Sequence, residues 1–216
     1  MKSTIPCPIA SISQTLNSMI NRKNLNMENT RDIVEGLNII NERANGLRKF
    51  VDSYKQIARL PEPQRQAVSM LGLLQKTCIL FDKQPIIIES VQDIQLYIDP
   101  VQFEQVLINL FKNSVEAMSQ VNPDGEIRVE WHVSGHFFSL IITDEGGGLS
   151  NPDNLFVPFY TTKKNGSGIG LVFCRQVIEA HGGWLSIVNR TECSGCRALV
   201  DIPLVNVDDT PRSNAD

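Results

Sequence analysis

The sequence predicts an α+β fold, in which helices cover one face of a mixed β-sheet as an α/β sandwich, preceded by an antiparallel helical hairpin. Two observations lead to this fold class. Up to residue 58 the apolar residues recur at alternating spacings of four and three, which is typical of helices in a bundle. After the prolines of "LPEPQRQ", short strands and amphipathic helices arrive in mixed order, and hairpin-like strand pairs dominate.

The hairpin is predicted from two apolar stripes. The longer stripe consists of Ile33, Leu37, Ile40, Ala44, Leu47, Val51, Tyr54 and Ala58. The shorter stripe consists of Ile5, Ile9, Ile12, Leu16 and Met19, and the polar "NRKNLNMENT" between the two reads as a turn. Together the stripes exceed what one hairpin can bury, so we expect a homodimer that forms a four-helix bundle. Packing of the hairpin on the following domain is the alternative.

The second region is predicted element by element. We expect a helix in "AVSMLGLLQKTCILF", strands in "PIIIES" and "IQLYI", a strongly apolar helix over 101–120, a strand pair in "GEIRVEWHV" and "FFSLIITDEG", a helix over 168–180, and a final pair in "GWLSIVN" and "RALVDIPL". The predicted domains are therefore the hairpin at 1–61 and a mixed α+β domain at 62–207, followed by a disordered polar tail at 208–216.

Composition limits the possible functions. The 216 residues carry a net charge of −4, which argues against nucleic-acid binding. No apolar run reaches membrane-spanning length and the first residues lack a signal core, so we expect a cytoplasmic chain without membrane contact, although the whole protein could be anchored in the inner membrane. The five cysteines show no disulfide pattern, and "CSGC" reads as a hairpin turn rather than a metal or redox site.

Three polar patterns are not explained by core packing. Asn109, Asn113 and Glu116 share one face of the apolar helix, and their oxygens suit Mg²⁺. Asp144 closes an apolar strand before three glycines. It could accept a hydrogen bond from an exocyclic amine on a flat ring, or it could simply start a turn.

The third pattern is the segment "LFVPFYTTKKNGSGIGL". Phe156 and Phe159 could anchor a loop by their rings, while Thr162, Lys163 and G-x-G-x-G offer donors to phosphates at a helix start. The lysines precede the glycines, which excludes a mononucleotide P-loop, and the late position and spacing exclude a dinucleotide-binding loop.

The order of these motifs carries a resemblance to a known family. N-x-x-x-N, D-x-G-x-G, F-x-P-F and G-x-G-x-G resemble the N, G1, F and G2 boxes of the histidine-kinase branch of the GHKL ATPases, over roughly residues 62–205. The resemblance implies a Bergerat fold that binds ATP with Mg²⁺. The glycine loop would then be the end of a lid over the nucleotide.

The resemblance also implies roles for single residues. Asn113 would hold Mg²⁺, with Asn109 beside it and Lys112 near the phosphates, and Glu116 would at most support them. Asp144 would accept the adenine amine. The other nucleotide-binding residues would be Gly146 and Gly148 at the adenine, and Phe159, Thr162, Lys163, Gly166, Gly168, Gly170 and Leu171 in and after the lid. The catalytic group would consist of Asn109, Lys112, Asn113 and Lys163.

The hairpin resembles the dimerisation and phosphotransfer helices of nitrogen-regulation-type sensor kinases. Aligned on Pro8, the acceptor histidine of that subgroup falls before Met1, and in another register it falls at Ser3, so the first helix contains no histidine. We read His132, His136 and His181 as surface or capping residues. The sequence therefore predicts the catalytic core of a two-component sensor histidine kinase, which transfers the γ-phosphoryl group of ATP to a histidine absent from this chain and serves a cognate response regulator. A hydrolysing GHKL ATPase and a nucleotide-binding regulatory module are the alternatives.

Overall fold

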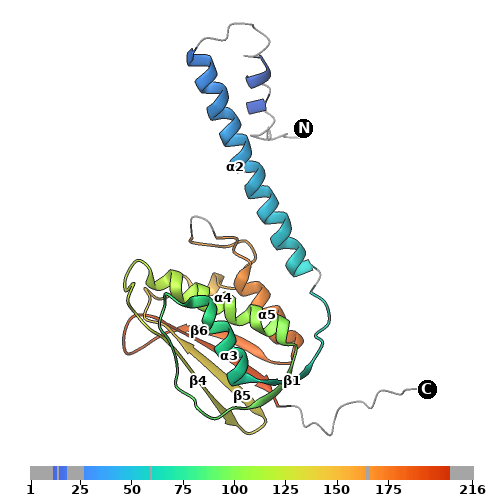
Figure 1. Ribbon diagram of the computed structural model, residues 1–216, viewed down its shortest axis with the longest axis vertical. Coiled ribbons are helices and arrows are strands. Elements are labelled where there is room, and N and C mark those ends of the chain that lie inside the picture. Colours follow the sequence, from blue (N-terminus) through green and yellow to red (C-terminus); the bar gives the residue numbers. More distant parts are fainter. Residues whose placement is uncertain (1–11, 14, 19–26, 59, 164–165, 205–216) are drawn as a thin grey trace, which may run out of the picture. The chain divides into compact units, whose positions relative to one another are not determined.

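The computed structural model describes residues 12–13, 15–18, 27–58, 60–163 and 166–204. It divides into two compact units, Met1–Lys55 and Gln56–Asp216 (Figure 1). The predicted domain boundaries at 61 and 207 stay predictions, and the proposed tail at 208–216 lies outside the described residues. No helix within the described part of the chain is both long and apolar enough to cross a membrane.

The first unit contains most of the long helix α2 (Met27–Ala58). Residues 12–13 and 15–18 are also helical, and Leu16 is buried there at 7% exposure. A side chain added at Gly36 would come within 2.8 Å of Leu16 Cδ2, so the glycine lets the leucine approach the helix closely. Val34 and Leu37 of α2 remain more than half exposed. Ile5, Ile9 and Met19 of the predicted shorter stripe lie outside the described residues.

The second unit is built on a five-stranded sheet in the order β2-β4-β5-β7-β6. Its strands are β2 (Ile86–Ile88), β4 (Ile127–Ser134), β5 (Phe137–Thr143), β6 (Trp184–Asn189) and β7 (Cys196–Pro203). β2 pairs with β4 in parallel and the other neighbours are antiparallel. The helices α3 (Met70–Cys78), α4 (Pro100–Met118) and α5 (Gly170–Ala180) lie on one face of the sheet (Figure 1). The predicted α+β sandwich with a mixed sheet is confirmed.

One predicted element is wrong at its start. The sequence predicts a single helix from Ala67, but β1 (Gln66–Ser69) is extended and pairs antiparallel with β3 (Gln95–Ile98). α3 begins only after Ser69, whose side chain accepts a hydrogen bond from the backbone of Gly72 at 2.9 Å. The serine satisfies one of the free N–H groups of the first turn, so the helix starts there.

The core lies between the sheet and α4. Along β7 buried and half-buried residues alternate, as expected for a strand with one face on the core. Phe103, Val106, Leu107 and Phe111 of α4 are fully buried against the sheet. Because these apolar residues occupy the inner face of α4, its asparagines are left at the edge of the core, where a ligand can reach them.

The beginning of α4 is tied to the segment before β1. Asp99 is the N-cap of α4, and its carboxylate also accepts the backbone N–H of Gln64 at 2.8 Å. Gln102 donates to the carbonyl of Pro61 at 2.9 Å. Arg65 donates to the carbonyl of Ala180 at 2.7 Å. These contacts fix residues 61–65 on the ends of two helices.

The sequence predicts that His181 is a surface or a capping residue. It is a capping residue, and it does not lie on the surface. It caps the C-terminal end of α5, but its side chain is only 2% exposed. Its Nε2 accepts the backbone N–H of Asp99 at 3.0 Å, and its Nδ1 faces the carbonyl of Val177 at 2.7 Å. Since the carbonyl can only accept, Nδ1 carries the proton and the ring is neutral.

Candidate nucleotide site

The outer edge of α4 carries the predicted asparagines. Asn109 and Asn113 are half buried and four residues apart, so they share one face of the helix. Gln105 Nε2 lies 3.4 Å from Asn109 Oδ1. The beginning of α5 passes close to Asn109, because a side chain at Gly170 would contact its amide at 3.8 Å. The predicted Asn109, Asn113 and Gly170 therefore come from two helices to one region.

Asp144 follows β5 and is 6% exposed. Its Oδ1 accepts two backbone N–H groups, from Gly146 at 2.9 Å and from Cys196 at 3.1 Å. Its Oδ2 accepts the hydroxyl of Ser114 at 3.1 Å. A carboxylate oxygen has two lone pairs, so these contacts use both on Oδ1 and leave one on Oδ2. The buried aspartate is thus oriented with one acceptor position to spare.

The turn between β6 and β7 braces Asp144 from the other side. Arg190 donates to the Asp144 carbonyl at 3.1 Å, and Ser194 donates to the Gly146 carbonyl at 2.7 Å. Gly195 has φ +122°, and a side chain there would overlap the Asp144 carbonyl. "CSGC" is thus a turn between strands, as predicted. Its thiols are free, and within the described residues no three His, Cys, Asp or Glu side chains come together to hold a metal.

Sequence reasoning missed Ser114, Ser194 and the backbone of Cys196 in this site. Ser114 directly follows Asn113 on α4, and a small hydroxyl residue beside a motif asparagine is a weak signal. No signal marks the other two, since their contacts are made 48 and 52 residues away from their partners. Burial and the neighbouring charge of Asp144 raise the pKa of Cys196 to about 11, so this thiol stays protonated.

The predicted glycines after Asp144 are shaped by packing. A side chain at Gly146 would approach Ala117 Cβ to 2.7 Å, so only glycine lets the loop lie this close to α4. Gly148 has φ +79°, and a side chain there would come within 3.0 Å of Asn189 Oδ1. Asn189 in turn accepts the backbone N–H of Leu149 at 2.6 Å. The loop is thus held by close packing on α4 on one side and by Asn189 on the other.

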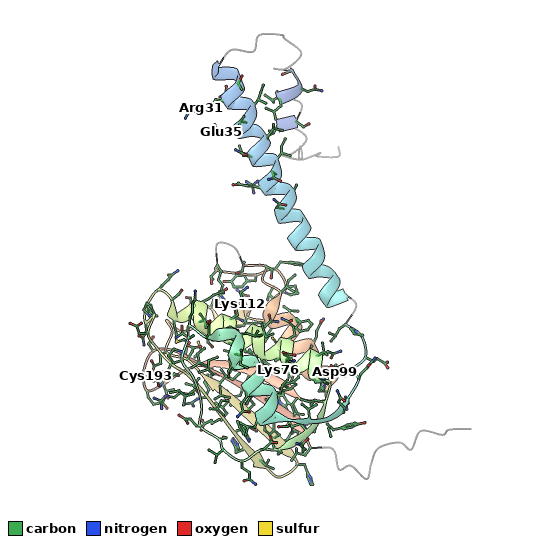
Figure 2. All side chains as sticks on the ribbon, in the orientation of Figure 1. Arg31, Glu35, Lys76, Asp99, Lys112 and Cys193 are labelled. Carbon is green, nitrogen blue, oxygen red and sulfur yellow. The ribbon has the colours of Figure 1, made fainter. Side chains whose placement is uncertain are left out.

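Lys163 reaches from the predicted lid to α4. Its ammonium lies 2.7 Å from Asn113 Oδ1 and 2.5 Å from Glu116 Oε2. Lys112 Nζ lies 3.9 Å from the other carboxylate oxygen of Glu116. Figure 2 shows Lys112 well along α4 from Asp99, the N-cap of the helix. The structure thus brings Lys112, Asn113 and Lys163 together, with Glu116 at their centre.

The rest of the predicted lid is arranged around Gly168. Phe159 and Gly168 both have positive φ, at 68° and 65°, and the backbone of Phe159 donates to the Gly168 carbonyl at 3.0 Å. Gly166 donates to the carbonyl of Lys163 at 3.1 Å. Thr162 is exposed, and Leu171 in the first turn of α5 packs partly on the core.

The two predicted anchor rings differ. Phe156 packs against the core, and the Arg175 guanidinium lies 5.0 Å from its ring centroid. Phe159 is 39% exposed and is not part of the core cluster. Its backbone N–H donates to the Gly168 carbonyl, which holds the loop.

The arrangement fits a nucleotide with a metal ion on three structural grounds. Asp144 keeps a spare acceptor for an amine, and glycines beside it let the backbone pack closely. The N-cap residue Ile169 makes no side-chain hydrogen bond, so the first N–H groups of α5 remain available to an anion. The Asn113 oxygen already accepts one cation, the ammonium of Lys163.

A comparison with protein families decides the assignment. The family described as histidine kinase-, DNA gyrase B-, and HSP90-like ATPase matches residues 98–206, from the end of β3 through β7. The chain belongs to this ATPase family. The match covers 109 of the 216 residues and contains every predicted site residue.

Known relatives of this ATPase-family chain are sensor kinases. Sensor protein TdiS of Thauera aromatica is 37% identical over 109 residues, which are 48% of this chain and 20% of the relative. An NtrY-like sensor histidine kinase of Rickettsia conorii is 32% identical over 175 residues, which are 77% of this chain and 28% of the relative. The second match confirms the nitrogen-regulation-type resemblance. The chain therefore spans about a fifth of TdiS and little more than a quarter of the NtrY-like kinase.

A solved structure shows the same fold. Histidine kinase ThkA in complex with response regulator protein TrrA has a TM-score of 0.63 and 22% sequence identity, and the alignment covers 92% of this chain and 58% of ThkA. The Bergerat fold that the family resemblance implied is confirmed.

Proposed function

We propose that this ATPase-family chain is the catalytic core of a two-component sensor histidine kinase, which binds Mg·ATP and transfers the γ-phosphoryl group to a histidine. One observation carries the nucleotide assignment. The buried carboxylate of Asp144 is held by three donors and keeps one free acceptor position. The exocyclic amine of adenine is the group that such a position accepts, whereas the exocyclic carbonyl oxygen of guanine in the same place is an acceptor and would be repelled.

The phosphates would lie between α4 and the start of α5. The uncapped N–H groups at Gly170 and Leu171 are aligned for an anion at a helix N-terminus. Lys112 and Lys163 add two positive charges nearby. Asn113 would hold Mg²⁺ by its amide oxygen, with Asn109 beside it. When bound, Mg²⁺ neutralises phosphate charge as the phosphoryl group transfers, while these residues hold the reactants in place.

The partners follow from the same proposal. ThkA is solved with a response regulator, and we extend a cognate response regulator to this chain. The exposed apolar residues of α2 support a homodimer through the helical hairpin. The activity would be cytoplasmic, where ATP is supplied, and the net charge of −4 gives no support for a nucleic-acid partner.

The first test is nucleotide binding with and without metal. Asn113→Ala should weaken the binding of ADP in the presence of Mg²⁺ much more than the binding of metal-free ADP, because it removes a metal ligand. Titration calorimetry measures both affinities. Equal losses under the two conditions would mean that Asn113 does not serve the metal.

The second test is phosphoryl transfer. The chain is mixed with γ-labelled ATP and with a longer form that carries a complete first helix with its histidine, in which Asp144→Asn blocks ATP binding. Label should appear on the longer form in an acid-labile linkage. Release of inorganic phosphate without transfer would favour a hydrolysing ATPase, and binding without turnover would favour a regulatory module.

A further inference from the structure

Lys163 makes two contacts that its expected role does not require. A lysine that serves only phosphates has no need of a protein partner, yet its ammonium bridges Asn113 Oδ1 at 2.7 Å and Glu116 Oε2 at 2.5 Å. The Asn113 oxygen is the one proposed for the metal. Lys163 therefore occupies, in this structure, a position that a metal ion would need.

We propose that Glu116 is a positioning residue that holds Lys163 on the Asn113 oxygen as a placeholder cation, and that metal-nucleotide binding displaces Lys163 toward the phosphates. The identity of the displacing cation rests on the proposed function. The contact between Lys163 and Glu116 does not depend on it.

Glu116 is the group that makes this position stable. A neutral amide oxygen alone holds an ammonium weakly against water, whereas a carboxylate makes a stronger, charge-assisted hydrogen bond. Glu116 follows Asn113 by three residues, so both side chains project from the same side of α4. The two oxygens thus form one seat for a single ammonium.

The charges around the seat favour release when a nucleotide arrives. Glu116 faces two ammonium groups, Lys163 at 2.5 Å and Lys112 at 3.9 Å. A divalent cation on Asn113 would repel Lys163, and phosphates would attract it. Glu116 would still be paired with Lys112 after Lys163 has left, so no carboxylate is left without a cation beside the phosphates.

The expected size of the effect follows from exposure. The side chains of Lys163 and Glu116 are 41% and 40% exposed, so water screens their attraction. Loss of such an exposed ion pair should change the equilibrium between the held and the released lid by about two- to fivefold. Hydrogen exchange and binding titrations resolve a change of this size.

The test compares lid exchange in nucleotide-free protein. Glu116→Gln should speed amide hydrogen exchange in residues 155–163 by about two- to fivefold, because the lid loses its hold on α4. Glu104→Gln is the matched control. Glu104 lies on the same helix, but it forms its ion pair, with an N–O distance of 2.8 Å, with Lys76 and away from the site (Figure 2 labels Lys76). The control should leave exchange in residues 155–163 unchanged.

A lysine variant shows whether the effect of Glu116→Gln on lid exchange depends on Lys163. In a Lys163→Met background, Glu116→Gln should add nothing to lid exchange, because its partner is already missing. An effect of Glu116→Gln that matches the control, or that persists in full without Lys163, would overturn the proposal.

The affinity for Mg·ADP is an independent measurement, and the two variants should change it in opposite directions. Glu116→Gln should tighten binding by about two- to fivefold, because no contact has to be broken first, whereas Lys163→Met should weaken it by removing a phosphate contact. Weaker binding in Glu116→Gln would contradict the placeholder role. If the wild-type chain binds no ADP at all, the proposed function fails, while the exchange comparison still decides the role of Glu116.

Discussion

Nε2 of His181 accepts the backbone N–H of Asp99 at 3.0 Å and so joins the end of α5 to the beginning of α4. The bond requires a neutral imidazole, because a protonated Nε2 has no lone pair to offer. Burial is the largest effect on the pKa of His181 and lowers it. The Val177 carbonyl raises the pKa and is the next largest effect, followed by the charge of Arg65, which lowers it, and that of Asp99, which raises it, so that the pKa is lowered on balance.

The stability of the domain should therefore fall with pH below about 6.5, the ordinary pKa of histidine. In that range the unfolded chain binds a proton at His181 more readily than the folded chain does, so the free energy of unfolding decreases by at most about 1.4 kcal/mol per pH unit. His181→Gln should flatten this dependence, as urea unfolding between pH 7.5 and 5.5 would measure.

His132→Gln is the control for this prediction, because His132 is exposed on β4. It should leave the pH dependence as it is. Asp99 does not interfere in this range. Burial alone would raise its pKa, but the backbone N–H groups of Gln102, Gln64 and Val101 outweigh burial and hold the pKa below 3.8. A slope that is identical in wild type and His181→Gln would contradict the prediction.

Asp144→Asn should abolish tight nucleotide binding with little loss of fold. Because two backbone N–H groups face Oδ1, the amide oxygen must take that place and its NH₂ group must take the place of Oδ2. The Ser114 hydroxyl can turn to accept from the NH₂ group. The adenine amine then meets a donor, so ADP affinity in calorimetry should fall about ten- to a hundredfold. Unchanged affinity would refute the role of Asp144.

Gly168→Ala should loosen the lid. Gly168 has φ +65°, and a Cβ there would lie 2.5 Å from the carbonyl carbon of Phe159. The left-handed backbone alone costs alanine about 1–2 kcal/mol, and the overlap adds to it. We expect faster hydrogen exchange in residues 155–163 and weaker ADP binding. Gly46→Ala is the control, since nothing lies within 4 Å of its added Cβ, and it should leave both unchanged.

Leu37→Glu should shift the chain toward monomers. Leu37 is 54% exposed on α2 and belongs to the predicted apolar stripe, so a dimer would bury it and a charge would oppose that burial. Sedimentation velocity over a range of concentrations measures the shift. Asn45→Glu, on the same helix outside the stripe, should leave the dimer intact. A wild-type chain that is monomeric at every concentration would remove the basis of the homodimer.

The sequence predicts well those elements whose patterns are local. The alternation in β4 and β5 and the apolar spacing in α4 identify these elements without knowledge of their partners. The sequence predicts a helix for the last three residues of β1 because they lead directly into the apolar pattern of α3, and only pairing with β3 makes them extended. A strand this short is determined by its neighbour rather than by its own residues.

The residues of the site also divide into those that local sequence predicts and those that it does not. Side chains within one motif, such as Asn109 and Asn113, could be placed together from their spacing. The donors that orient Asp144 could not, because Cys196 contributes a backbone N–H that any residue would offer. The burial of His181 could not be predicted for a similar reason, since it depends on contact with Asp99, 82 residues away.

The position of β7 has a consequence for the protein as it leaves the ribosome. Among the strands that the structure describes, β7 is the last to be synthesised, yet it lies inside the sheet, between β5 and β6. Until residue 203 has emerged, β5 presents an open edge to other chains, and the Cys196 backbone cannot yet orient Asp144. A nascent chain that stops short of β7 should therefore be prone to aggregation and unable to retain nucleotide, even though every motif residue from Asn109 to Leu171 has already been made.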